Sequence, residues 1–257
     1  MEDEDELIAI DFEAELDNDL NDTDPLDVDF PEAAKPDPEE MLLLLKAPDV
    51  QQRMLATRAF CELQDSRAIP QLIQLLSDTC PLVRVSAAYS LGRNPSPAAV
   101  EPLISQLDRD LNGYVRKGAV WALGNCRDRR SLFPLTDALK NDIPAVRLWA
   151  ASGLAQMAGL GYDAVIAAIP PLIEALIQDS VAAVRSNCAW SLGQLARELP
   201  SNIVYAGAID GLIEALEEDK DLGVREDAKA ALLKVGDPRG LQLIESLEKR
   251  ELEGEGF

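Results

Sequence analysis

The chain of 257 residues contains no histidine, and only 5% of its residues are aromatic. The lack of histidine excludes Ser-His-Asp and Cys-His catalysis, the His-Glu-x-x-His zinc site and any iron site that needs histidine. Hydrophobic residues make up 47% of the sequence, so a core with so few rings must be aliphatic and rich in alanine. No uninterrupted apolar run reaches the roughly 18 residues of a transmembrane helix, so we expect no membrane insertion.

Basic residues are also scarce, since 24 Lys and Arg stand against 46 Asp and Glu, for a formal charge of −22. This charge makes nucleic acid and anionic membranes poor partners. The start, MEDEDELIAIDFEAE, lacks the basic and apolar regions of a secretory signal. The four cysteines lie far apart and form no C-x-x-C pair. We therefore expect a cytoplasmic protein with reduced thiols and no metal site of its own.

The negative charge is concentrated at one end of the chain. Residues 1–40 hold 18 acidic residues and one base, a charge of −17, which leaves −5 for the remainder. This composition predicts a disordered acidic tail over residues 1–37. Four apolar residues of the tail recur every four positions, as on one face of a short helix: Ile8, Phe12, Leu16 and Leu20. Two interpretations stay open, a solvated tail that only aids solubility and a segment that folds on contact with a partner.

The remainder of the chain is built from an internal repeat. In each copy a proline, or Gly211 in the last one, precedes an aspartate by eight residues, and an arginine follows after a short turn. The aspartates are Asp78, Asp110, Asp142, Asp179 and Asp219, and the arginines are Arg84, Arg116, Arg147, Arg185 and Arg225. Apolar periodicity predicts a helix A that ends near the aspartate and a helix B that begins near the arginine. Placed there, the two side chains can form a hydrogen-bonded ladder from one repeat to the next.

Such helix pairs cannot bury an apolar face alone, so they stack. The sequence therefore predicts an all-α, right-handed α-solenoid of about six helix pairs over residues 38–252, followed by a short tail, 253–257. Helices over 37–46 and 238–252 are expected to cap the ends. The expected core comprises small residues, Ala56, Ala87, Ala119, Ala150 and Cys188, and larger ones a turn later, Phe60, Leu91, Leu123, Leu154, Leu192 and Leu232.

The side of helix B that points away from this core is rich in aromatic residues. At about 100° per residue, the fifth position after each arginine lies nearly opposite the core. Tyr89, Trp121 and Trp190 stand at that position, Trp149 stands at the second, and Val85, Leu148, Arg93 and Lys117 lie nearby. Exposed rings are costly unless something covers them, which favours a partner-binding ridge on the concave face. The alternative is that superhelical twist turns the rings into grooves between helices; one candidate ligand of the ridge is the chain's own segment 7–30.

The proline, aspartate and arginine pattern resembles that of the HEAT-repeat family. The segments AAYSLGRNPSPAAVEPLISQL and GAVWALGNCRDRRSLFPLTDAL are more specifically similar to the HEAT-like repeats of cyanobacterial phycobilin lyases. The resemblance covers about residues 38–250 and implies the fold, while solenoids of this family host many functions. The HEAT-repeat deoxyhypusine hydroxylases hold a di-iron centre with His-Glu pairs, so a chain without histidine does not belong with them.

The resemblance leaves three functions open. The first is a protein-binding scaffold or assembly factor, which we favour because no catalytic constellation is visible. The second is one subunit of a phycobilin lyase, which attaches bilin to a phycobiliprotein or removes it, with that protein or a second lyase-type subunit as partner. The third is a partner of an iron–sulfur carrier protein. We expect no cofactor held by the chain itself; bilin or an iron–sulfur cluster would come through a partner.

Overall fold

The structure is a computed structural model that describes residues 36–252. Residues 1–35 of the predicted disordered tail, with its apolar face at positions 8–20, and the C-terminal segment 253–257 lie outside the described residues. From Asp37 onward the chain forms one compact unit. This described part contains thirteen α-helices, α2 to α14, three short 3-10 helices and no strand, so the prediction of an all-α protein is confirmed.

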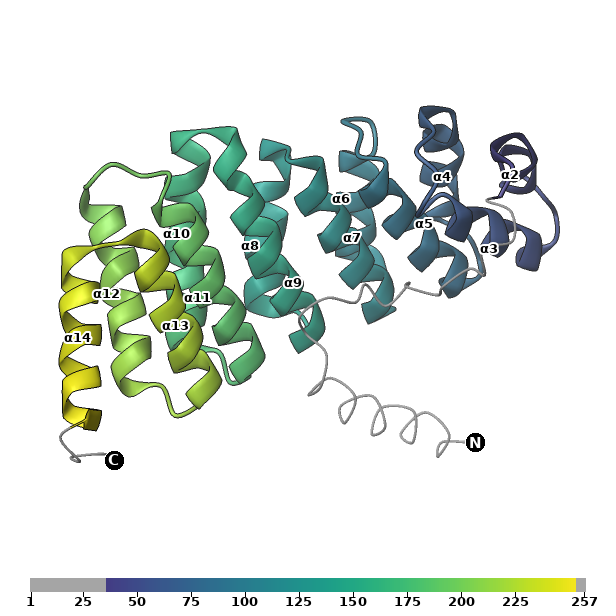
Figure 1. Cartoon of the computed structure of the whole chain (residues 1–257). Helices are drawn as coiled ribbons and strands as arrows, with labels where there is room; N and C mark the ends of the chain where they lie inside the picture. Colours follow the sequence, from purple (N-terminus) through teal and green to yellow (C-terminus); the bar gives the residue numbers. More distant parts are fainter. Residues whose placement is uncertain (1–35, 253–257) are drawn as a thin grey trace, which may run out of the picture. The chain divides into compact units, whose positions relative to one another are not determined.

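Six helix pairs follow one another along the stack, and a single helix ends it (Figure 1). The A helices are α2 (Pro38–Leu44), α4 (Ile69–Leu75), α6 (Val100–Arg109), α8 (Leu132–Asn141), α10 (Tyr162–Gln178) and α12 (Ile203–Glu218). The B helices are α3 (Val50–Ala59), α5 (Pro81–Arg93), α7 (Gly113–Cys126), α9 (Pro144–Ala155), α11 (Ala182–Ala196) and α13 (Leu222–Val235). The last helix is α14 (Pro238–Leu252), and the 3-10 helices are η1 (Ser66–Ala68), η2 (Arg129–Ser131) and η3 (Gln156–Leu160).

The repeat prolines start helices more often than they bend them. Pro70, Pro102 and Pro134 lie in the first turn of α4, α6 and α8, where a missing N–H costs nothing. A proline ahead of each aspartate therefore begins helix A in these three repeats and neither breaks nor bends it. Pro170 and Pro171, in contrast, lie inside α10.

The core follows the repeat pattern. Every small and large residue that the sequence assigns to the core of the B helices is fully buried, and Cys188 lies among them. These residues belong to one continuous cluster that runs through all the repeats. A buried aliphatic core of this kind depends on its neighbours in the stack, since no single helix pair encloses it.

Glycines bring the B helices close together. A Cβ built on Gly124 of α7 would lie 2.9 Å from the Cα of Gly153 in α9, and one on Gly193 would lie 2.8 Å from the Cβ of Ala231 in α13. The B helices also contact one another more extensively than the A helices do. A stack that is more tightly spaced on one side curves toward that side, so the B helices form the inner layer of the solenoid.

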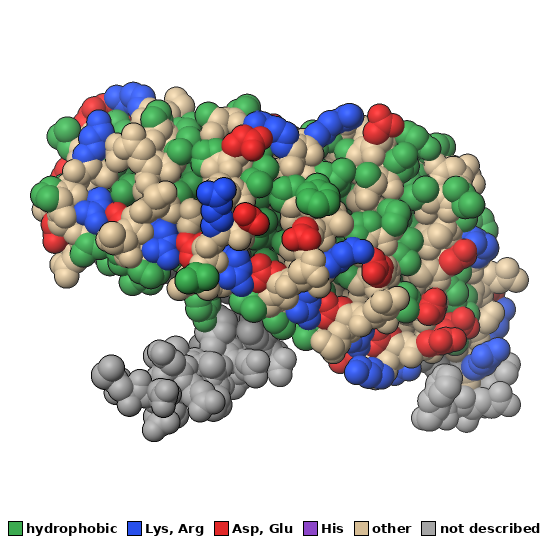
Figure 2. Space-filling model, turned by 180° about the vertical axis from the view of Figure 1, so that it is seen from behind, with side chains coloured by type: hydrophobic (Ala, Val, Ile, Leu, Met, Phe, Trp, Pro, Cys, Tyr) green, Lys and Arg blue, Asp and Glu red, His purple; other side chains and the backbone are tan. Residues whose placement is uncertain are grey.

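Charged groups of both signs are spread over the solenoid surface. On the face drawn in Figure 2, basic and acidic side chains alternate with apolar ones, and neither sign dominates. This distribution fits the formal charge of −5 that remains when residues 1–40 are set aside. The charge of the whole chain is therefore a poor guide to what the solenoid binds.

Candidate functional site

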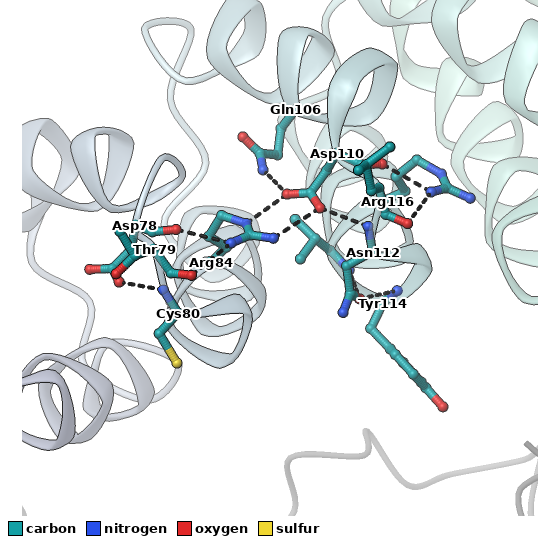
Figure 3. Close-up of polar contacts among 11 residues, drawn as sticks. Asp78, Thr79, Cys80, Arg84, Gln106, Asp110, Asn112, Tyr114 and Arg116 are labelled. Atoms are coloured by element: carbon teal, nitrogen blue, oxygen red, sulfur yellow. Dashed lines mark hydrogen bonds and ion pairs between the residues drawn. The ribbon is translucent and has the colours of Figure 1, made fainter. Parts of the chain in front are cut away.

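A ladder of arginine–aspartate bonds joins consecutive repeats at the turns between helix A and helix B (Figure 3). The Arg84 guanidinium donates from Nε and Nη2 to the Asp110 carboxylate, at 2.7 and 3.1 Å, and from Nη1 to the backbone carbonyl of Asp78, at 3.0 Å. Asp110 also accepts the backbone N–H of Asn112 at 2.8 Å and the amide of Gln106. Each arginine thus holds the turn of its own repeat and the aspartate of the next.

The same geometry recurs along the stack. Four further pairs have their Nε and Oδ2 atoms 2.7 to 2.8 Å apart: Arg53–Asp78, Arg116–Asp142, Arg147–Asp179 and Arg185–Asp219. The sixth arginine differs, because the buried Nε of Arg225 has no hydrogen-bond partner within residues 36–252. In α14 the segment LIESLEKR corresponds to LIEALEED of α12, so Arg250 occupies the place that Asp219 has there.

The ladder is charged at neutral pH. The hydrogen bond with Asp110 raises the pKa of Arg84, and burial offsets only part of that effect. Burial by itself raises the pKa of the Asp110 carboxyl, but the bonds from Arg84 and the Asn112 N–H outweigh it and hold that pKa below its usual range. The carboxyl pKa values of Asp78, Asp179 and Asp219 are lowered in the same way. Groups that are paired and permanently charged hold helices in register, and they are poorly suited to proton transfer.

Two of the four cysteines, Cys126 and Cys188, show no sign of activation. Burial raises the pKa of the Cys126 and Cys188 thiols, whereas a nucleophilic cysteine needs a lowered pKa. Over residues 36–252, no group of three or more His, Cys, Asp or Glu side chains is arranged to hold a metal ion.

One part of the predicted aromatic ridge is wrong. Tyr89 is buried, with 6% of its surface exposed, although its position on the helix points away from the core. The ring packs against Gly118 of α7, where a Cβ would lie 3.5 Å from it, an ordinary van der Waals distance. The ring fills this space between α5 and α7 and meets the Trp121 ring at a centroid distance of 5.3 Å. The alternative, that rings turn into grooves between helices, therefore holds for Tyr89.

The three tryptophans remain on the inner layer at different depths. Trp121 is half-buried and covers Gly92, where a Cβ would lie 2.3 Å from the indole. Trp149 is half-buried against the core, and Trp190 is 44% exposed. Val85 and Leu148 are also half-buried and contribute less apolar surface than the helical positions suggest.

Two of the rings carry a cation. The Arg93 guanidinium lies 5.7 Å from the centroid of Trp121, and the Lys117 ammonium lies 5.6 Å from that of Trp149. Both distances are within the range of cation–π attraction. We call these five residues the aromatic–cationic surface: Trp121, Trp149, Trp190, Arg93 and Lys117. It spans helices α5 to α11.

The inner layer is free of acidic residues over most of its length. The B helices α3, α5, α7, α9 and α11 contain no Asp or Glu, whereas α2, α6, α8, α10 and α12 of the A layer each carry at least one. Only α13 among the B helices breaks this rule, with Glu226 and Asp227. In a chain of formal charge −22, Arg93 and Lys117 of the aromatic–cationic surface therefore lie on helices that carry no acidic residue.

A shallow hollow adjoins this surface where α5 and α7 end. Arg93 and Trp121 line it, together with Asn125 and Arg127, which the sequence analysis missed. Arg127 follows α7 in a left-handed conformation with φ 47°, and its Nη2 donates to Gln156 of the next repeat at 3.1 Å. The repeat could have indicated Asn125, because it stands nine residues after Arg116, as Arg93 stands nine residues after Arg84.

Comparison with known proteins identifies the class first. The described fold is an α-solenoid of helix pairs, and no helix within it is long and apolar enough to cross a membrane. The family model for HEAT repeats matches residues 38–112, 100–193 and 169–251. The chain therefore belongs to the HEAT-repeat family. No curated protein sequence matches it significantly.

Solved structures share this architecture. An engineered protein is 25% identical, with 78% of this chain and 98% of that chain covered and a TM-score of 0.59. A designed armadillo repeat protein in complex with the peptide (KR)4 is 23% identical, with 77% and 98% covered and a TM-score of 0.60. A chain from the complex of CpcE and CpcF of phycocyanin lyase from Nostoc sp. PCC7120 is 19% identical, with 88% and 100% covered and a TM-score of 0.55. The last two likenesses show the fold alone.

Proposed function

We propose that this protein is a HEAT-repeat scaffold that binds an acidic segment of a partner protein along its inner layer. The observation that carries the proposal is the segregation of charge: five B helices without an acidic residue present two cation–π pairs on one surface. The fold suits a peptide-binding role in general, since the designed armadillo protein of similar fold is in complex with a peptide, (KR)4, although that peptide is basic.

The geometry suits a preorganised binding surface. The indole of Trp121 is fixed against Gly92 and the tyrosine ring of Tyr89, so little side-chain entropy is lost when a partner covers it. A carboxylate that approaches Arg93 or Lys117 gains a charged partner and keeps the aromatic ring beneath it. Trp190, with 44% of its surface exposed, offers the apolar contact of a binding hot spot.

The test compares charge reversal on the inner layer with charge reversal elsewhere. The partner is purified from the source cell with the full chain, and its affinity is then measured for Arg93→Glu with Lys117→Glu. The matched control is Lys46→Glu with Lys220→Glu, two exposed residues outside the surface that change the net charge equally. We expect at least about a tenfold loss of affinity for the first pair and little change for the second. Equal losses for the two pairs would refute the proposed surface.

The tryptophans provide a test that does not depend on charge. Trp121→Ala together with Trp149→Ala should abolish copurification of the partner, because large aromatic contacts dominate binding energy. Circular dichroism checks that the double variant keeps its helices. Retention of the partner by a folded double variant would contradict the proposal.

A second candidate function is one subunit of a phycobilin lyase. The similarity of fold to a chain of the CpcE–CpcF complex, which covers 88% of this chain and 100% of that one, favours it over other enzymes. A bilin carries propionate groups and flat rings, for which Arg93, Lys117, Trp121 and Trp149 are chemically suitable. A lyase subunit should shift the visible spectrum of free bilin on binding, whereas a scaffold should leave the spectrum unchanged.

A further inference from the structure

A groove on the opposite, outer layer lies between the A helices α6 and α8. Its lining includes the apolar residues Ile104, Leu107 and Ala138 beside the ladder residues Asp110, Arg116 and Asp142. At its edges stand two of the most exposed large apolar residues of the described chain, Phe133 at 78% and Leu111 at 98%. Rings and aliphatic side chains exposed this far beside apolar lining residues are typical of a contact surface.

Both walls of the groove carry carboxylates. On α6, Glu101, Ser105 and Asp108 follow the spacing of one helical face, and on α8, Phe133, Asp137 and Asn141 do the same.

Little positive charge neutralises these walls. The nearest ion-pair partner of Asp108 is Arg109, whose Nε lies 3.8 Å away, and both side chains are more than three-quarters exposed. Asp137 accepts a hydrogen bond from the Asn141 amide at 2.9 Å. Glu101 has a closer cation, with Arg130 at 3.2 Å, and Asp110 and Asp142, which also line the groove, are paired with the ladder arginines Arg84 and Arg116.

Neighbouring junctions of the outer layer are closed by side chains. Lys140 Nζ and Glu174 Oε2 lie 2.5 Å apart between α8 and α10, and Arg239 Nη1 and Asp210 Oδ1 lie 2.6 Å apart between α12 and α14. Between α10 and α12, the Ile173 side chain packs against Gly211. At the α6–α8 groove, Glu101 of α6 pairs with Arg130 of η2, just before α8, and farther along the groove acidic residues stand on both walls, where like charges cannot bridge the gap.

We infer that the α6–α8 groove is a second docking surface, and that its partner is a basic amphipathic segment with a large apolar side chain flanked by Lys or Arg. The apolar side chain fits the apolar part of the lining beside Phe133, and the flanking cations meet Asp108 and Asp137. Charge complementarity selects this occupant, because two acidic walls repel an acidic segment. The inference is independent of the proposed function, which concerns the inner layer and an acidic partner.

The test uses a fluorescein-labelled amphipathic peptide of leucine and lysine, about 14 residues long, with the full chain. A lysine-rich peptide of equal charge, in which serine replaces leucine, is the reference ligand. Affinities are measured by fluorescence anisotropy at about 0.15 M salt, where charges farther apart than about 8 Å are screened. The acidic tail attracts both peptides in every variant, so comparisons between variants cancel its contribution.

Two variants carry the test. The double substitution Asp108→Asn with Asp137→Asn should lower the affinity for the leucine–lysine peptide about fivefold, as expected for the loss of two partly exposed ion pairs. The matched control, Glu214→Gln with Glu217→Gln on α12, removes the same charge from exposed positions of the outer layer and should weaken it less than twofold. Phe133→Ala should lower the affinity for the leucine–lysine peptide about fivefold and leave the affinity for the reference peptide unchanged.

Three outcomes would overturn the inference. The first is equal weakening by the two double substitutions, which would mean general attraction to an acidic protein. The second is unchanged binding with Phe133→Ala. The third is equal affinity of the wild-type chain for the two peptides, which would exclude an apolar contribution. Because Phe133 is 78% exposed, its truncation leaves the fold intact, and circular dichroism verifies this.

Discussion

The Asp110→Asn substitution removes the charge of one ladder rung and keeps its size. Asp110 accepts two hydrogen bonds from Arg84 and one each from Asn112 and Gln106. Asparagine retains one acceptor oxygen but turns an amino group toward donors. The side chains of Asp110 and Arg84 are only 4% and 18% exposed, so water replaces the lost bonds poorly. We expect the free energy of unfolding to fall by about 2–4 kcal/mol.

Urea denaturation followed by the helical circular dichroism signal measures this loss. The control is Glu245→Gln, since Glu245 pairs with Lys249 at 2.7 Å but both side chains are about two-thirds exposed. An exposed pair of this kind contributes less than about 0.5 kcal/mol. Because repeats interact mainly with their neighbours, the weakened rung should also broaden the transition of the Asp110→Asn variant. If the two variants unfold within about 0.5 kcal/mol of each other, the ladder does not stabilise the stack.

The loss of unfolding free energy in the Asp110→Asn variant should depend on pH if its origin is electrostatic. Hydrogen bonds hold the pKa of Asp110 below its usual range, so folding favours the charged carboxylate. A lowered pKa adds stability above the pKa of the unfolded chain, about 3.9, and that stability disappears as the pH falls through the folded value. The difference in free energy of unfolding between the wild type and Asp110→Asn should therefore be constant from about pH 5 to 7 and shrink below about pH 4. A difference that does not shrink at all as the pH falls below about 4 would contradict this explanation.

Three other predictions test packing, reactivity and the tail. Gly92→Ala should displace the Trp121 indole, change tryptophan fluorescence and cost about 1–3 kcal/mol, because its Cβ would lie 2.3 Å from the ring. Gly159→Ala, with open space around it, is the control, and equal effects would argue against this packing. Cys188 should resist alkylation at pH 8 until urea unfolds the chain, as mass spectrometry of its peptide can show; rapid native labelling would contradict its burial. Deletion of residues 1–36 should raise partner affinity if the tail competes for the inner layer, and unchanged affinity would refute that hypothesis.

The sequence was sufficient to predict the core because each buried position is set by one helix and its own repeat. Counting from Arg84, positions three and seven are Ala87 and Leu91, and both are fully buried. The aspartate–arginine spacing likewise predicted which residues meet, as the bonds between Arg84 and Asp110 show. The exception is Arg225, because the last helix carries Arg250 where an aspartate would complete the ladder.

The exposure of the aromatic residues could not be predicted from one helix. Tyr89 and Trp190 occupy the same position after their arginines, yet 6% of one and 44% of the other is exposed. The Tyr89 ring lies against Gly118, the second position of the next repeat, a neighbour that its own helix does not reveal. The same pairing brings Ser152 and Asn187 within hydrogen-bonding distance, at 3.1 Å. A prediction that includes the neighbouring helix would therefore have placed Tyr89 in the groove.

The two proposed surfaces follow from one property of the stack. Acidic residues are placed on the outer helices, and the inner helices up to α11 have none, so a single chain presents opposite preferences on its two layers. A partner that carries acidic and basic amphipathic segments can then engage both layers, with an affinity that exceeds either contact alone. Charge reversal at Arg93 and Lys117 would leave the groove beside Phe133 intact, and substitution of Asp108 and Asp137 would leave the inner layer intact. A partner that is lost only when Arg93 and Lys117 are reversed therefore binds the inner layer. A partner that is lost only when Asp108 and Asp137 are substituted binds the groove on the outer layer.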